Sequence, residues 1–240
     1  MTRRRGVQRT AKTATRPRAR VAPPPRAWQR MLSGRRLDLL DPSPVDVEIE
    51  DIAHGLARVA RWNGQTHGAH AFSVAQHSVV VEDIARRLEP QMEPRWRLAA
   101  LLHDAAEYVI GDMISPFKTA LGVDYKDFEA RLEAAVHIRF GLPAITPARI
   151  KKRIKEADLV CAFFEATQLA GFDVVEAETF FGAPPPGFEI DVSPLPPSDA
   201  QELFLARFET LFRDAHGEAP KPARLAPGRP SPGRHGGGDA

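Results

Sequence analysis

The stretch LAALLHDAAEYVIGDMISP, residues 98–116, constrains the chain more than any other. Apolar residues recur at helical spacing after Pro94, which predicts a helix. His103, Asp104 and Glu107 follow within little more than one turn, and Glu107, four residues after His103, is expected on the same side. Unpaired charge is costly to bury, so a divalent cation would stabilise such a helix. A His-Asp dipeptide alone also fits an exposed helix end, so a metal site requires ligands from other segments.

The charge of the chain is distributed unevenly. Residues 1–27 hold nine Lys or Arg and no acidic residue, whereas residues 28–216 hold nine more acidic than basic residues. Residues 217–240 are rich in Pro and Gly. We therefore predict a disordered basic arm at 1–27, one folded domain at 28–216 and a disordered tail at 217–240. An acidic domain is not expected to bind nucleic acid.

The sequence contains no apolar run of about eighteen residues, so no membrane-spanning helix and no membrane partner are expected. The Arg-rich start lacks the apolar segment of a secretory signal, although it fits the weak pattern of an organelle transit peptide. Cys161 is the single cysteine, which excludes an internal disulfide and suits a reducing compartment. We predict a cytoplasmic protein.

Apolar residues recur at intervals of three and four in seven segments, and no alternating strand pattern is apparent, which predicts an all-α bundle. The expected N-caps are Asp51, Ser73 and Thr146, and Ser198 with Gln201 resembles a capping box. Residues 31–44 and 184–197 are expected to be irregular because turn residues and prolines are frequent there. The predicted helices run from Asp51 to about Asn63, Ser73 to Leu88, Pro94 to Gly111, Asp124 to Arg139, Thr146 to Gly171, Phe172 to Phe181 and Ser198 to His216.

Two polar residues interrupt apolar helix faces elsewhere in the sequence. His77 falls on the apolar side of its helix, where a single histidine is about as often a satisfied core residue as a ligand. Asp158 breaks the apolar stripe of the helix that begins near Thr146. Together with His103 and Asp104, these residues provide two imidazoles and two carboxylates, a set that suits Mn, Co, Fe, Ni, Zn or Mg. The nearby cations, Lys151, Lys152, Arg153 and Lys155, are expected to form a solvated face.

This order of ligands, His, then His-Asp, then Asp, resembles that of the HD-domain metal-dependent phosphohydrolases. The likeness is greater to the HD-domain 5'-deoxynucleotidase group, and it extends over residues 49–171. The blocks that carry it are RW at 61–62, AQHS at 75–78, HDAAE at 103–107, GD at 111–112, PFK at 116–118 and KEADLVCA at 155–162. The resemblance implies an all-α HD-domain bundle.

The resemblance implies one divalent cation held by His77, His103, Asp104 and Asp158. Such a cation polarises a phosphoryl oxygen and lowers the pKa of its bound water. Glu107 would then move a proton to the departing 5' oxygen.

The resemblance also implies residues that contact the substrate. Arg61 would hold the phosphate, Trp62 would pack against the sugar, and Asp112 would orient water or the sugar. Arg58 and Lys118 are further candidates for contact with the phosphate. From spacing alone, Arg61 could equally be a surface residue and Trp62 a core residue.

These observations favour a metal-dependent phosphohydrolase that removes the 5'-phosphate from deoxyribonucleoside monophosphates. Alternatives are a deoxynucleoside triphosphate triphosphohydrolase, a hydrolase of other phosphomonoesters or signalling nucleotides, and a non-catalytic nucleotide-binding or scaffold protein. Glu107 and Asp112 argue against the last alternative, because a site that only binds needs neither. The expected partner is a small-molecule nucleotide, and the resemblance suggests a homodimer.

Overall fold

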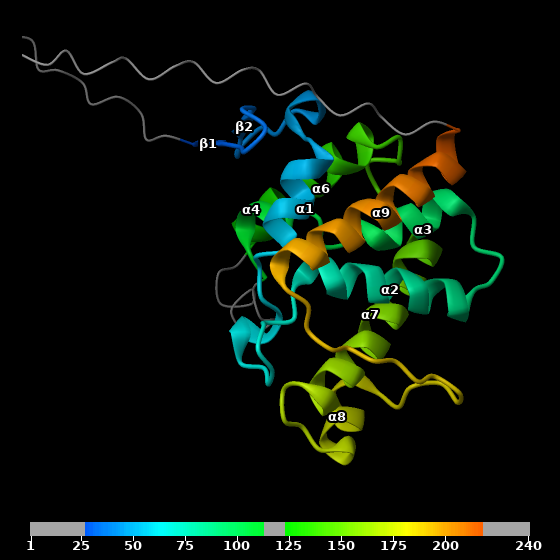
Figure 1. Cartoon of the computed structure of the whole chain (residues 1–240). Helices are drawn as coiled ribbons and strands as arrows, with labels where there is room; N and C mark the ends of the chain where they lie inside the picture. Colours follow the sequence, from blue (N-terminus) through cyan, green and yellow to red (C-terminus); the bar gives the residue numbers. More distant parts are fainter. Residues whose placement is uncertain (1–26, 113–122, 218–240) are drawn as a thin grey trace, which may run out of the picture.

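The computed structural model describes residues 27–112 and 123–217 and shows an all-α bundle (Figure 1), which confirms the predicted fold class. The predicted disordered ends, apart from residues 27 and 217, lie outside the described residues, as does Lys118. No helix in the described ranges combines the length and apolar character needed to cross a membrane. The helices are α1 (Ile49–Leu56), α2 (Val74–Leu88), α3 (Pro94–Leu101), α4 (Glu107–Ile110), α6 (Val123–Arg139), α7 (Ala148–Gln168), α8 (Val174–Phe181) and α9 (Pro197–His216).

Helix α2 lies at the centre of the bundle and packs against α3, α7 and α9. Helix α9 also contacts α1 and α3, so it covers one side of the bundle (Figure 1). Phe204 and Phe208 of α9 are buried, whereas Leu203 is 39% exposed. Alternation of buried and exposed residues at helical spacing therefore orients α9 on the bundle.

A buried ion pair joins three of these helices. Glu82 on α2 is fully buried and accepts a hydrogen bond of 2.7 Å from Nε of Arg97 on α3. Its second oxygen accepts from Nη1 of Arg207 on α9. Because a buried carboxylate without partners is strongly destabilising, these pairs fix the relative positions of α2, α3 and α9.

A two-stranded antiparallel hairpin precedes the helices. Strand β1 (Trp28–Arg30) pairs with β2 (Arg36–Asp38), and Trp28 lies opposite Asp38. Leu37 is fully buried in the main core. The prediction of irregular structure for residues 31–44 is therefore wrong over 36–38. Strands of three residues are too short to show an alternating pattern in the sequence.

The structure confirms Ser73 as the N-cap of α2, since its hydroxyl accepts a hydrogen bond from the backbone N–H of Gln76. The predicted cap at Asp51 is wrong. Helix α1 begins two residues earlier and ends at Leu56 rather than near residue 63. The carboxylate of Asp51 instead accepts hydrogen bonds from the backbone N–H and the hydroxyl of Ser33, at 2.8 and 2.6 Å.

Two further predicted caps are also displaced. The residue before α7 is Pro147 rather than Thr146, and α9 begins at Pro197, so Ser198 lies inside the helix. The hydroxyl of Ser198 donates to Asp199 and does not cap the helix. Proline fixes a φ angle suited to the start of a helix, so it sets both boundaries without a side-chain cap.

Helix α1 packs closely against α4 at Gly55. A Cβ atom on Gly55 would lie 2.8 Å from Cβ and 2.9 Å from the carbonyl oxygen of Tyr108. Because one of these atoms belongs to the backbone, a side-chain rotation cannot relieve the contact. The absence of a side chain at Gly55 therefore sets how closely α1 approaches the segment that starts at Glu107.

We expect Gly55→Ala to lower the free energy of unfolding by about 1–3 kcal/mol, the usual cost of overpacking. Helix propensity alone would have the opposite sign, since alanine in a helix is favoured over glycine by roughly 1 kcal/mol. Urea denaturation monitored by circular dichroism measures the difference. A variant at least as stable as the wild type would contradict the packing argument.

Candidate metal centre

The helix that contains the His-Asp dipeptide is interrupted at that dipeptide. Helix α3 ends at Leu101, residues 102–106 form turns, and α4 starts at Glu107. In the turns, backbone N–H groups bond to carbonyls three residues earlier, as from Glu107 to Asp104 at 3.0 Å. The prediction of one continuous helix to Gly111 is therefore wrong, and the side chains of His103 and Asp104 extend from a turn.

The side chain of His103 stabilises this interruption. Its Nδ1 lies 2.9 Å from the carbonyl oxygen of Ala100, in the last turn of α3. A polar side chain that bonds to a nearby backbone group competes with continuation of the helix. An imidazole that donates through Nδ1 keeps a lone pair on Nε2, the form that binds a metal ion.

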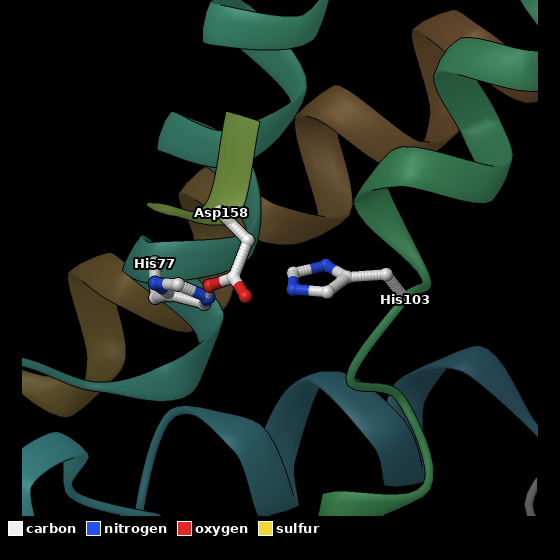
Figure 2. Close-up of side chains that lie close together, drawn as sticks. All are labelled: His77, His103 and Asp158. Atoms are coloured by element: carbon white, nitrogen blue, oxygen red, sulfur yellow. Dashed lines mark ion pairs between the residues drawn. The ribbon is translucent and has the colours of Figure 1, made fainter. Parts of the chain in front are cut away.

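The ring of His77 on α2 is oriented in the same way, with Nδ1 in a hydrogen bond and Nε2 facing the cluster of candidate ligands. Its side chain is fully buried, and Nδ1 lies 2.6 Å from Oε1 of Glu165 on α7. Nδ1 therefore donates to Glu165, and Nε2 faces His103 and Asp158 (Figure 2). Nε2 of His77 and Nε2 of His103 are both buried and have no hydrogen-bond partner among the described residues.

Carboxylate oxygens lie close to both Nε2 atoms. Asp158 Oδ1 is 3.4 Å and Asp104 Oδ2 is 3.5 Å from Nε2 of His77, and Asp104 Oδ2 is 3.2 Å from Nε2 of His103. One ligand atom from each of His77, His103 and Asp158 lies within 4.8 Å of the others. Figure 2 shows the carboxylate of Asp158 between the two imidazoles.

The spacing of these atoms fits a shared cation. Two ligands about 2.1 Å from one ion are about 3.0 Å apart at a right angle and about 3.4 Å apart at the tetrahedral angle. The observed separations of 3.2, 3.4 and 3.5 Å are close to this range. Imidazole nitrogens combined with carboxylate oxygens suit a divalent ion of intermediate hardness.

The electrostatics of the cluster also favour a cation. Burial would raise the pKa of Asp104, but His103 and His77 hold it well below its usual range, and the same two residues lower the pKa of Asp158 against the effect of burial. Both carboxyl groups are therefore ionised. Burial and Arg61 would lower the pKa of His77, but Glu165 raises it well above its usual value. A divalent cation would replace the proton that these carboxylates otherwise attract to the imidazoles.

Glu165 is the main functional candidate that the sequence analysis missed. Its carboxylate is fully buried, Oε1 accepts from His77, and Oε2 accepts from Nε1 of Trp62 at 2.7 Å and from Nε of Arg61 at 3.2 Å. Burial would raise the pKa of Glu165, but Arg61 and His77 hold it far below its usual value. A carboxylate behind a ligating histidine fixes the ring orientation and increases its basicity.

The position of Glu165 in the sequence was a usable signal. Asp158, Cys161 and Glu165 recur at positions i, i+3 and i+7, so they share one side of α7. His77, Cys161 and Glu165 form a second group with metal-type ligands, all buried. Burial raises the pKa of Cys161 to about 12, so its thiol stays protonated and donates to Glu165 Oε1 at 3.3 Å. This second group therefore supports His77 and is not a separate cation site.

The loop before α2 places Arg61 and Trp62 beside Glu165. Nη1 of Arg61 lies 3.2 Å from Oδ2 of Asp112, so two carboxylates hold its guanidinium, and they raise its pKa well above the usual value although burial opposes this. Trp62 and Asn63 have φ angles of +57° and +51°, in the left-handed region. Each such residue costs about 1–3 kcal/mol and persists only when its surroundings impose it.

A second apolar cluster compensates for this strained backbone. The ring of Trp62 lies 5.5 Å from that of Phe172 and 5.8 Å from that of Phe181. Backbone hydrogen bonds also close the loop at its base, from Arg61 N–H to the carbonyl of Phe72 at 2.8 Å. The residues of this cluster are Phe72, Phe163, Phe164, Ala166, Leu169, Ala177 and Val192.

A cavity of about 340 Å³ opens beside the cluster of ligands. Its lining includes His103, Asp104 and Asp158, together with residues of α6 and of the start of α7. Lys151 and Lys155 belong to its lining, and Nζ of Lys155 is 2.7 Å from Asp158 Oδ2, so these two lysines do more than form the solvated face that the sequence predicted. The remaining lining residues are Ala99, Glu129, Glu133, His137, Thr146 and Ile154.

The other predicted site residues lie around this arrangement. Glu107 is 3% exposed at the start of α4, and it does not belong to the lining of the cavity. Asp112 pairs with Arg61. Arg58 is exposed and donates to Gln201 on α9 at 3.0 Å, which directs its guanidinium toward another helix. The predicted roles of Glu107, Asp112, Arg61 and Trp62 in catalysis and substrate binding remain predictions.

Comparisons with known proteins identify the family of this chain. A family model of the HD domain matches residues 74–142, a range that contains His77, His103 and Asp104. An uncharacterized protein of Rhodobacter capsulatus is 59% identical over 196 residues, which cover 80% of this chain and 99% of that protein. The chain belongs to the HD-domain family.

A second relative of this HD-domain protein is the uncharacterized protein YfdR of Escherichia coli K12. It is 33% identical over 166 residues, covering 69% of this chain and 85% of YfdR. HD domains bind divalent metal ions, and the described residues include groups able to hold one. The domain indicates a metal-dependent hydrolase.

We expect Glu165→Gln to weaken binding of a divalent ion by about 10–100-fold, the usual effect of losing the partner of a ligating histidine. The glutamine keeps the shape of the side chain but removes the negative charge that orients His77. Calorimetric titration with Mn²⁺ measures the affinity. The matched control is Glu156→Gln on the same helix, because Glu156 pairs with Arg153 away from the cluster. Equal affinities of wild type and Glu165→Gln would show that Glu165 only fills space.

Proposed function

We propose that this HD-domain protein is a metal-dependent phosphomonoesterase that removes the 5'-phosphate from nucleoside monophosphates, with deoxyribonucleotides preferred. The proposed ligands of the cation are His77, His103, Asp104 and Asp158. The observation that carries the proposal is that two buried imidazole Nε2 atoms and the oxygens of two ionised carboxylates converge at one side of a cavity. A volume of about 340 Å³ is sufficient for a small organic ligand, since such sites usually measure about 300–1,000 Å³.

The proposed chemistry divides between the cation and the protein. A divalent cation supplies Lewis acidity and lowers the pKa of bound water. His77 and His103 present Nε2 because Glu165 and the carbonyl of Ala100 occupy the opposite ring nitrogens. Glu107 directly follows the turn, and its proposed role is to hold the proton that the departing 5' oxygen needs.

The charges that line the cavity favour a substrate with one phosphoryl group. Four carboxylate side chains and two lysine side chains, Lys151 and Lys155, are present in the lining. A divalent cation and the two lysines together offset the four carboxylates but leave no excess positive charge, so each added phosphoryl charge is unfavourable and a triphosphate, with up to four negative charges, is the least favourable. Sites for triphosphates usually supply several basic groups or additional metal ions. Arg61 adds little free positive charge, because Glu165 and Asp112 already pair with it.

We expect His77→Ala and Asp158→Asn each to abolish both metal content and phosphatase activity. Each change removes one ligand and leaves other buried charges without their common partner. Elemental analysis of the purified variants measures bound metal, and release of inorganic phosphate from dAMP measures activity. The control is Asp127→Asn, which changes an exposed carboxylate on α6. Normal metal content in both variants would overturn the ligand assignment.

We expect steady-state kinetics with Mn²⁺ or Co²⁺ to give a higher kcat/KM for dAMP than for dATP, because the cavity has too little positive charge to offset three phosphoryl groups. Inorganic phosphate and longer phosphate products are assayed separately. Release of triphosphate from dATP in preference to phosphate from dAMP would instead support a triphosphohydrolase. A comparison of dAMP with AMP tests the proposed exclusion of a 2'-hydroxyl by Trp62, and equal rates would remove only that role.

A further inference from the structure

The part of the cavity lining that comes from α6 and the adjoining residues, called here the α6 side, differs in composition from the cluster of ligands. It is formed by Glu129, Glu133 and His137 on α6, together with Thr146 and Lys151. A phosphomonoesterase must hold the leaving group of its substrate next to the phosphorus atom. Under the proposed function, the phosphate lies at His103, Asp104 and Asp158, so the leaving group extends toward the α6 side.

His137 is the residue on this side whose hydrogen bonding is incomplete. Its side chain is 2% exposed, it belongs to the lining of the cavity, and its Nε2 has no hydrogen-bond partner among the described residues. A buried polar atom without a partner costs free energy, so such an atom beside a cavity indicates a group that arrives from outside the protein.

The protonation of the His137 ring determines whether Nε2 would bind a hydrogen-bond donor or an acceptor of the ligand. Nδ1 lies 3.2 Å from the carbonyl oxygen of Pro143, so Nδ1 carries the proton and donates. Burial and nearby Lys151 lower the pKa of His137 below its usual value, although Glu133 opposes this, so the ring is neutral. Nε2 is therefore a hydrogen-bond acceptor.

Two carboxylates near His137 on α6 are also hydrogen-bond acceptors. Glu133 lies one turn before it and Glu129 two turns before it on α6, and both line the cavity. Carboxylates accept hydrogen bonds and do not donate them when ionised. Lys151 is a donor on this side, but the acceptors outnumber it, so this side of the cavity suits a neutral ligand group with N–H or O–H donors.

We propose that this side of the cavity binds the nucleoside leaving group and that Nε2 of His137 accepts a hydrogen bond from a donor on it. The inference rests on the proposed function and adds a residue that selects among substrates. Two donors of a deoxynucleotide have the required chemistry, an exocyclic amino group of the base and the 3'-hydroxyl of the sugar.

Ratios of kcat/KM test this proposal, because a general loss of active protein cancels in each ratio. One pair is dAMP and its purine analogue without the 6-amino group. The other pair is dAMP and 2',3'-dideoxyadenosine 5'-monophosphate. We expect wild type to favour dAMP by about 5–100-fold in one of the pairs, the usual effect of leaving a buried polar group unpaired.

Two substitutions separate the acceptor from the shape of the ring. We expect His137→Asn, which retains a donor near Pro143 but removes the acceptor at Nε2, to bring that ratio close to one. His137→Gln places an amide oxygen near the position of Nε2 and should restore part of the preference. Loss of preference in the first pair identifies the base amine as the donor, and loss in the second identifies the sugar hydroxyl. Unchanged ratios in His137→Asn would overturn the proposal.

Nucleoside binding distinguishes failure of this proposal from failure of the proposed function. If wild type hydrolyses none of the nucleotides, the phosphomonoesterase proposal is wrong. Calorimetric binding of deoxyadenosine, its analogue without the amino group and 2',3'-dideoxyadenosine then decides the role of His137, since binding requires no turnover. Equal affinities of wild type and His137→Asn for all three nucleosides, or no binding by wild type, would contradict it.

Discussion

The buried carboxylate of Glu165 is the interaction on which the rest of the site depends. A fully buried negative charge is tolerable only when hydrogen bonds and an opposite charge compensate its loss of water. Here His77, Arg61, Trp62 and Cys161 all contact the two oxygens. These contacts join α7 to α2 and to the loop before α2. The same carboxylate fixes the direction of the His77 ring, so the packing of the bundle and the chemistry of the site share one group.

The strained loop follows from this arrangement. Trp62 and Asn63 adopt left-handed backbone angles that are unfavourable for such residues, and the hydrogen bond from Trp62 to Glu165 offsets part of that cost. The aromatic rings around Trp62 contribute further stabilisation. The position of Arg61 is therefore set by contacts that its neighbour makes. This coupling is typical of functional sites, where local strain is retained because the surroundings impose it.

The sequence predicted the all-α fold and drew attention to His77 and Asp158, because a polar residue that interrupts an apolar helix face is visible in one dimension. It did not predict the break at His103, since apolar spacing continues unchanged through the turn and the deciding bond joins the imidazole to a backbone carbonyl. Glu165 was missed for a related reason: its partners come from segments about 90–100 residues away. The acceptor groups around His137 could be recognised only once the folded structure showed that they line one cavity, because spacing along the chain does not predict a cavity.

The dual position of His103 has a consequence for dynamics. The same ring bonds to the end of α3 through Nδ1 and faces the other proposed ligands through Nε2. A cation bound in the proposed site would act as a cross-link between α2, the turn and α7, in addition to the hydrogen bond from His77 to Glu165 that already joins α2 to α7. Free energy gained from binding would then appear as resistance to unfolding, in proportion to the logarithm of the cation concentration. The supply of the metal would thus affect how long the folded protein persists in a cell as well as how fast it acts on its substrate.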